Sequence, residues 1–363
     1  MTDRYHRHRL IDWFDQDSIK SRRIGVIGAG AVGNEVIKSL TLLGVGHVTV
    51  FDYDRIEESN LTRSVLFRGS DVGQFKSEVA ATRARELDTT VSIEAVVGDF
   101  WKKSTLSDIK SFDVLFCCVD NFEARIRANT VARLSGTDLV NIGIDARHAM
   151  VEVFPFGSNA KTACYECTLP HSVYQKLSER YSCGHLRKVS FVEKKIPTTI
   201  ITSSIAASMA VSIGLRLGNS TETTSAQRFY VDTITGHASV AKMERNDYCP
   251  SCGRYESTET VFVCRRTIGS MADLNPDITV FTSEPILVQY TYNNETTTVF
   301  KNAADFDTDF LTGISEDTDR VDVVIRDQFT IGELMELHAD RDLPCKFVVF
   351  SDGQKQLIAE LME

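Results

Sequence analysis

The sequence is poor in positive charge: 40 Lys and Arg residues stand against 50 Asp and Glu residues, which gives a formal net charge of −10. A chain with this balance repels nucleic acid and anionic membrane surfaces unless it carries a local basic patch. We therefore expect no nucleic acid and no membrane among its partners. Over 363 positions, 42% hydrophobic and 25% charged residues are typical of a soluble globular protein of about two domains.

The sequence also lacks the segments that direct a chain out of the cytoplasm. Residues 1–10 are polar and rich in Arg and His, without the apolar run of a signal peptide. Residues 196–215 carry no charge, but they include seven Ser or Thr and lack the aromatic ends of a membrane span. We expect a helix buried in a soluble domain, and a cytoplasmic protein.

Cysteine is too scarce for a disulfide scaffold, with nine in the whole chain. Four of them form two Cys-x-x-Cys pairs that are separated by 81 residues. Four thiolates make the closed tetrahedral site that structural zinc prefers. A redox role is less consistent with the sequence, because neither pair lies at a strand-to-helix junction. The spacing predicts Zn²⁺ on Cys164, Cys167, Cys249 and Cys252, the alternative being four unrelated thiols.

The first 150 residues alternate between strands and helices. Short β-branched or apolar runs predict strands at 23–27, 47–51, 92–97, 113–119 and 138–142. Helical spacing predicts helices at 32–43, 76–87 and 122–134. This order predicts an α/β fold, a Rossmann-like doubly wound sheet of mostly parallel strands with helices on both faces.

The pattern changes beyond this region. A hairpin is predicted at 228–233 and 238–242, and after residue 252 most segments look like strands. Those strands are predicted at 260–265, 278–282, 286–292, 296–300, 321–325 and 346–350, with one helix at 330–338. We expect domains at residues 1–254 and 255–363, the second being smaller, β-rich (α+β) and open to a β-grasp-like interpretation.

A Gly-x-Gly-x-x-Gly motif joins the first predicted strand to the first predicted helix. Its glycines, Gly28, Gly30 and Gly33, permit a tight turn, and the helix N-terminus offers free N–H groups to a phosphate. Asp52 ends the next strand, where an acid can accept a hydrogen bond from a ribose hydroxyl. These features predict a nucleotide site, and an NAD-dependent oxidoreductase would share them.

Further motifs follow in order: residues 52–54, 59–63, 72–76 and 119–121. Together with Arg4-Tyr5-His6-Arg7 they resemble the ThiF/MoeB superfamily, the ATP-dependent activators of ubiquitin-like and sulfur-carrier proteins. The resemblance covers residues 4–252 and not 253–363. It implies adenylation of the C-terminal glycine carboxylate of a carrier protein, with ATP and Mg²⁺ as cofactors. The nucleotide-binding residues that it implies are Gly28, Gly30, Gly33, Asp52, Asp54, Asn60, Arg63, Lys76, Asp120 and Asn121.

The same residues suit this chemistry by their side chains. Attack of a carboxylate on the α-phosphorus of MgATP needs positioning and neutralised charge. Asp120 can bind Mg²⁺ through hard oxygen ligands, Arg63 and Lys76 can neutralise phosphates, and Asn60 can orient them. This set argues against the oxidoreductase, and its completeness argues against a third hypothesis, a catalytically inactive partner subunit.

Two further residues depend on the resemblance. Arg7 would be an arginine finger that reaches the partner subunit's site, which implies a homodimer. Cys183, in a crossover segment near 168–197, would form a thioester, as Pro197 and Ser203 resemble the features that follow such a cysteine. The alternative is an incidental exposed thiol. Residues 255–363 would recruit a conjugating enzyme, bind the carrier or dimerise.

Overall fold

The computed structural model describes residues 3–170, 172–173, 197–217, 225–254, 261–292, 294–303 and 321–362. The chain divides into two compact units. The first is Met1–Thr168 with Lys195–Ser257, and the second is Leu169–Lys194 with Thr258–Glu363. The predicted boundary after residue 254 stays a prediction.

The first unit contains an eight-stranded sheet in the order β3-β2-β1-β4-β5-β6-β7-β8. Strands β3 to β5 pair in parallel along this order, and β6, β7 and β8 are added antiparallel. The strands are β1 (Arg23–Ile27), β2 (His47–Phe51), β3 (Ser92–Val96), β4 (Val114–Cys117), β5 (Asp138–Ile144), β6 (His148–Phe154), β7 (Gln227–Asp232) and β8 (Ala238–Lys242). The predicted fold class and the hairpin of β7 and β8 are confirmed.

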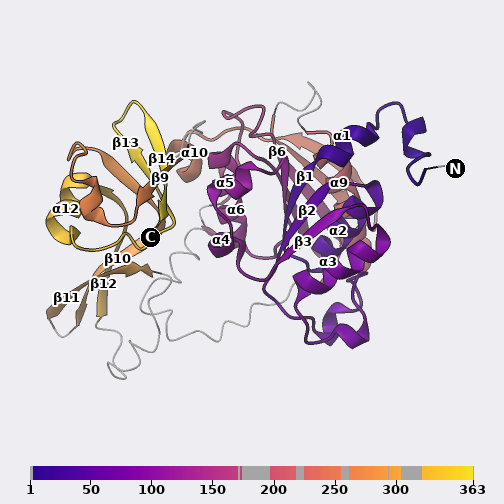
Figure 1. Cartoon of the computed structure of the whole chain (residues 1–363), viewed down its shortest axis with the longest axis horizontal. Coiled ribbons are helices and arrows are strands. Elements are labelled where there is room, and N and C mark those ends of the chain that lie inside the picture. Colours follow the sequence, from indigo (N-terminus) through magenta and orange to yellow (C-terminus); the bar gives the residue numbers. More distant parts are fainter. Residues whose placement is uncertain are drawn as a thin grey trace. The chain divides into compact units, whose positions relative to one another are not determined.

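Helices cover both faces of this sheet (Figure 1). The longer helices are α2 (Ala31–Leu43), α3 (Lys76–Leu87), α6 (Phe122–Ser135) and α9 (Ile200–Gly214). Helices α2, α3 and α9 share one apolar core with the strands, and α6 covers the other face together with short α4 (Phe100–Lys103) and α5 (Leu106–Lys110). Helices α4, α5 and α1 (Gln16–Ser21) were not predicted from the sequence.

Helix α9 is the uncharged segment whose burial was predicted. Thr199 caps its first turn by accepting a hydrogen bond from the backbone N–H of Thr202, which sets where the helix begins. Small residues such as Ala206 and Ala210 are fully buried, so the helix packs closely against α2, β5 and β6. Within the residues that the structure describes, no helix has the length and apolarity to cross a membrane.

The second unit contains a sheet in the order β11-β10-β13-β14-β9, with β12 paired to β10. Its elements are β9 (Val261–Arg265), β10 (Thr279–Tyr292), β11 (Glu295–Asn302), β12 (Val321–Thr330), β13 (Phe347–Ser351), β14 (Gln356–Met362) and α12 (Ile331–His338). Two predicted strands are one strand, β10, whose pairing register shifts between Phe281 and Ile286 around Pro285, because proline cannot donate to a sheet. A β-grasp-like fold stays a prediction.

One buried acid lies at the start of β5. Asp138 is 5% exposed and accepts a hydrogen bond of 2.8 Å from the backbone N–H of Gly157. Burial raises the pKa of its carboxyl to about 6, although this hydrogen bond and the charge of Arg22 oppose the shift. The folded protein therefore holds a proton on Asp138 at pH values where the unfolded chain has lost it.

We predict that Asp138→Asn gains stability relative to the wild type as the pH rises from about 4 to about 7. The folded pKa is the higher one, so stability from the protonated acid is lost across this window. The difference in unfolding free energy should reach roughly 1 to 3 kcal/mol, measured by denaturant titration at several pH values. The exposed Asp247 provides the control Asp247→Asn. A difference that does not change with pH would contradict the prediction.

Candidate functional site

Glycine residues build a tight loop between β1 and α2, at the place where the sequence predicts a phosphate site. Gly28 has a φ of +92°, a conformation that L side chains rarely adopt. A Cβ atom on Gly33 would lie 1.9 Å from the carbonyl oxygen of Gly28, whereas a Cβ atom on Gly30 would meet nothing within 4 Å. The loop is therefore tight at Gly28 and Gly33 and open beside Gly30, which fits the close approach of a phosphate.

The end of β2 faces this loop. The carboxylate of Asp52 accepts hydrogen bonds from the backbone N–H groups of Ala29, at 2.6 Å, and Asp54, at 2.8 Å. Burial is the main cause that raises the pKa of Asp52, and these hydrogen bonds oppose it. Lys76 Nζ lies 2.7 Å from Asp54 Oδ2. Three predicted residues, Asp52, Asp54 and Lys76, thus lie together at the carboxyl end of β2, beside the glycine loop.

Asp120 follows β4 and is exposed. Asp120 lies within electrostatic reach of Tyr53. Burial is the largest cause that raises the pKa of the Tyr53 hydroxyl, and the negative charges of Asp54, Asp99, Asp52 and Asp120 add to it. Asn121 caps α6 by accepting a hydrogen bond of 2.8 Å from the N–H of Ala124. Its side chain therefore has a structural task, whereas Asp120 on the same turn is exposed to solvent.

Asn60 and Arg63 lie on the turn around η2 (Glu58–Asn60). Asn60 Oδ1 accepts a hydrogen bond from the N–H of Glu57, and Arg63 donates to the carbonyl of Ser59 at 2.7 Å. Both side chains are therefore held on their own turn.

Arg7 lies on the turn before η1 (His8–Leu10). It is exposed, and neighbouring residues attach its segment to the rest of the unit: Arg4 pairs with Asp88 at 3.1 Å, and the Tyr5 hydroxyl donates a hydrogen bond to the same carboxylate. The segment is thus anchored to the rest of the unit, and Arg7 lies exposed on it.

The two Cys-x-x-Cys pairs come together in the first unit. Cys164 directly precedes η4 (Tyr165–Thr168) and Cys167 lies within it. In the same way, Cys249 directly precedes α10 (Pro250–Arg254) and Cys252 lies within it. Their sulfur atoms lie within 4.8 Å of one another, with separations of 3.6 Å for 164–249, 3.9 Å for 164–167 and 3.5 Å for 167–252. A tetrahedral zinc with Zn–S bonds of about 2.3 Å needs sulfurs about 3.8 Å apart, so the four residues fit this metal.

A buried cation accompanies the cluster. Arg133 of α6 is 1% exposed, and its Nη1 donates to Cys252 Sγ at 3.3 Å. Four thiolates around a divalent metal carry a net negative charge, and an N–H donor from a guanidinium stabilises it. Asn129, one turn earlier on α6, accepts a hydrogen bond of 3.0 Å from the N–H of Tyr165. Helix α6 therefore supports both the cluster and the Asp120 turn.

Cys183 lies outside the described residues. Among the other lone cysteines, burial raises the pKa of Cys117 and of Cys345, and raises that of Cys118 well above its ordinary value. Protonated thiols are poor nucleophiles. These three thiols therefore serve packing.

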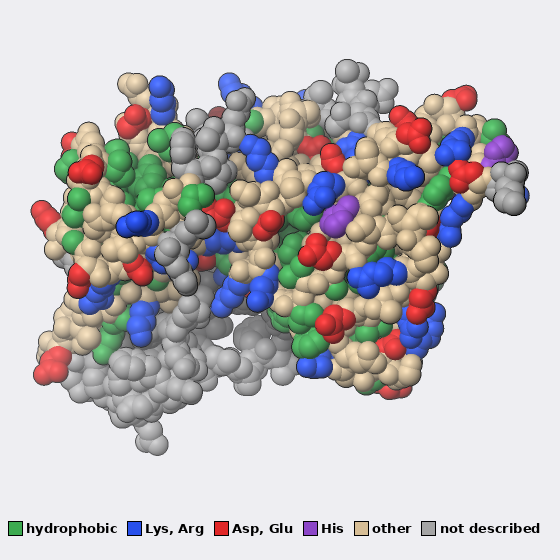
Figure 2. Space-filling view, in the orientation of Figure 1, with side chains coloured by type: hydrophobic (Ala, Val, Ile, Leu, Met, Phe, Trp, Pro, Cys, Tyr) green, Lys and Arg blue, Asp and Glu red, His purple; other side chains and the backbone are tan. Residues whose placement is uncertain are grey.

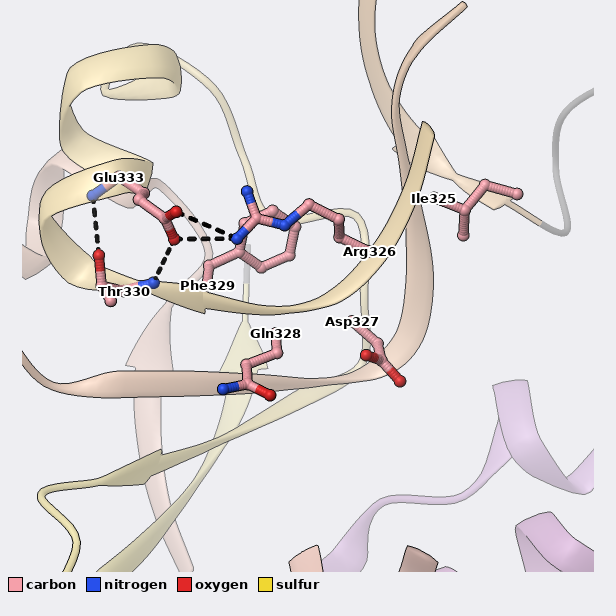
Figure 3. A pocket seen from close by; sticks show the side chains of 7 residues that line it. All are labelled: Ile325, Arg326, Asp327, Gln328, Phe329, Thr330 and Glu333. Atoms are coloured by element: carbon pink, nitrogen blue, oxygen red, sulfur yellow. Dashed lines mark hydrogen bonds and ion pairs between the residues drawn. The ribbon is translucent and has the colours of Figure 1, made fainter. Parts of the chain in front are cut away.

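The second unit carries a pocket formed by β12 and the start of α12 (Figure 3). Arg326 donates to both carboxylate oxygens of Glu333 at 3.1 Å and lies over the ring of Phe329. Glu333 also accepts from the N–H of Thr330 at 2.8 Å. Arg326 and Glu333 are thus bonded to each other rather than available to a ligand, so we place no candidate site in this pocket. On the face in Figure 2, Lys and Arg side chains are interspersed with Asp and Glu side chains.

The first unit thus combines a mostly parallel α/β sheet, a tight glycine loop at the carboxyl end of β1 and a four-cysteine cluster. The chain belongs to the ThiF family, whose model matches residues 4–251.

Three curated relatives illustrate this membership. A sulfur carrier protein adenylyltransferase of Thermus thermophilus is 30% identical over 69% of this chain and 90% of its own. A SAMP-activating enzyme E1 of Haloferax volcanii is 35% identical over 47% of this chain and 63% of its own. The ubiquitin-like modifier-activating enzyme 5 of Bombyx mori is 28% identical over 56% and 54%. The chain spans most of the first relative and between half and two thirds of the other two.

A solved structure of E. coli MccB with ATP has the same fold. It superposes with a TM-score of 0.55 at 23% identity, over 70% of this chain and 74% of that one.

We predict that the purified protein contains about one zinc per chain, because the four sulfurs have tetrahedral spacing. Cys249→Ser should lose the metal and lower the melting temperature, since removal of one ligand opens the site. Elemental analysis and thermal unfolding measure both, with Cys264→Ser in the second unit as the matched control. A wild-type protein that contains no metal, and whose four thiols all react in the folded state, would contradict the prediction.

Proposed function

We propose that the protein uses MgATP to adenylate the C-terminal glycine carboxylate of a ubiquitin-like or sulfur-carrier protein. The observation that carries the proposal is the open space beside Gly30, with Asp52, Lys76 and Asp120 placed around the same edge of a ThiF-family domain. A carboxylate oxygen attacks the α-phosphorus, the bond to the β-phosphate breaks, and pyrophosphate leaves.

Each residue has a role in this proposal. Backbone N–H groups at the start of α2 bind phosphate, Asp52 accepts from the ribose, and Asn60, Arg63 and Lys76 orient and neutralise the phosphates. Lys76 exchanges its present partner, Asp54, for a phosphate oxygen. Asp120 supplies carboxylate oxygens for Mg²⁺, which neutralises charge on the phosphates when bound.

Assembly and later steps belong to the same proposal. The exposed Arg7 extends into the site of a second copy, which makes the enzyme a homodimer. Cys183 receives the acyl group from the adenylate as a thioester, AMP leaves, and a conjugating enzyme or a sulfur-transfer reaction takes the product. The second unit recruits one of these partners. We place the enzyme in the cytoplasm.

We predict that Asp120→Asn reduces ATP–pyrophosphate exchange at least a hundredfold and leaves the fold intact. Loss of a carboxylate that binds Mg²⁺ removes several kcal/mol of transition-state stabilisation. Exchange is measured with a ubiquitin-like or a sulfur-carrier protein that ends in glycine, and circular dichroism checks the fold. Asp247→Asn is the control. A rate within a few-fold of the wild type would place the metal elsewhere.

We predict that Cys183→Ala retains pyrophosphate exchange and loses any thiol-sensitive adduct with the carrier. Adenylation precedes the thioester, so it does not need this thiol. Denaturing gels with and without reductant detect the adduct, and Cys264→Ala is the control. An adduct that survives Cys183→Ala would identify another nucleophile, and a wild type that forms none would make Cys183 incidental.

A further inference from the structure

A row of polar side chains crosses the sheet of the first unit where apolar residues would be expected. Asn141 of β5 is the register partner of Glu152 of β6, which in turn is the partner of Arg228 of β7. The row lies on one face of the sheet, because paired residues point to the same side. Asn141 is 1% exposed and Glu152 is fully buried.

A continuous series of hydrogen bonds connects the side chains of this row. Arg228 donates from Nε, at 2.8 Å, and from Nη2, at 2.6 Å, to Glu152 Oε1. Asn141 Nδ2 donates to Glu152 Oε2 at 2.7 Å, and Asn141 Oδ1 accepts from Arg125 Nη1 at 2.5 Å. The side-chain amide of Asn141 thus donates a hydrogen bond to Glu152 on one side and accepts one from Arg125 on the other.

The row ends at the candidate active site. Arg125, in the first turn of α6, donates from Nη2 to the carbonyl oxygen of Val119 at 2.5 Å. Val119 directly precedes Asp120. The other end reaches Thr168, whose hydroxyl accepts from Arg228 Nη2 at 3.0 Å, directly after Cys167 of the cluster. The backbone that bears Asp120 is therefore held by a guanidinium whose orientation the row fixes.

A buried carboxylate is costly, and apolar residues of similar size are often at least as stabilising at such a place. Its hydrogen bonds do, however, define one geometry. The two oxygens of Glu152 accept from donors on both sides, and Asn141 takes one rotamer. Arg125 has one acceptor on Asn141 and one on the Val119 carbonyl. Such support holds a metal-binding group close to its working position before the ligand arrives.

We propose that Asn141, Glu152 and Arg228 are positioning residues that preorganise the Asp120 turn for Mg²⁺ through Arg125. This inference rests on the proposed role of Asp120 in MgATP binding. None of the three residues contacts the substrate in this account, and their effect passes through the Val119 carbonyl.

The polarity of the row provides the test. Asn141→Asp places an acceptor against Glu152, and Glu152→Gln places an amide donor against either Arg228 or Asn141, so each single change breaks one link. Combined in one chain they restore every link: the new carboxylate on β5 accepts from Arg125 and from the new amide on β6, whose oxygen accepts from Arg228. The net charge equals that of the wild type.

The measurement is ATP binding by calorimetry on the full chain, at a series of Mg²⁺ concentrations and without a carrier protein. Each single variant should raise the Mg²⁺ concentration needed for half-maximal binding about fivefold or more, with zinc content unchanged. The double variant should return within about twofold of the wild type. Glu94→Gln, on an exposed side chain of β3, is the matched control.

Each outcome has one meaning. Single variants with wild-type Mg²⁺ dependence would overturn the positioning role, and so would a double variant that is as impaired as the two single changes combined. If a single variant does not fold, Arg228→Lys, which keeps the charge and loses the paired donors, tests the same link from the half-exposed end. A wild type that binds no MgATP would refute the proposed function itself.

Discussion

The close contact between Gly33 and the carbonyl oxygen of Gly28 is the constraint on which the proposed nucleotide site depends. The 1.9 Å separation that a Cβ atom would have there means that α2 starts against the end of β1 with no room for a side chain. Because the helix is placed so closely, its N-terminal N–H groups open onto the space beside Gly30. Asp52 then bonds the N–H of Ala29, which ties β2 to the same loop.

Much of this arrangement could be predicted from the sequence, because the signals are local. Apolar runs gave the parallel strands, helical spacing gave α2, α3 and α6, and the glycine spacing located the loop. The short helices α4 and α5 were missed since their ends depend on single caps, Asp99 and Thr105, within segments too short to show a period. Strand β14 was missed for a different reason, since Gln356–Met362 does not alternate between apolar and polar residues.

The polar row was not predicted either. Asn141 and Glu152 look like ordinary exposed strand residues in the sequence, and only the pairing of β5 with β6 reveals that they face each other in the interior. Arg133 is similar: it occupies an ordinary position on α6, and its task becomes visible only when Cys252 arrives from more than a hundred residues away. Pairs that are distant in sequence carry no periodic signal, whereas a Cys-x-x-Cys spacing does.

The cluster of four cysteines has a consequence for the order of events during synthesis. A growing chain exposes Cys164 and Cys167 first, and the second pair follows only after α9, β7 and β8 have been made. The sulfurs can therefore meet only once the chain has been made as far as Cys252, beyond the last strands of the first sheet. Closure of this long loop removes conformational freedom from the unfolded chain, in the way that a crosslink does. The four thiols can therefore act as a crosslink only after every strand of the first sheet has been synthesised.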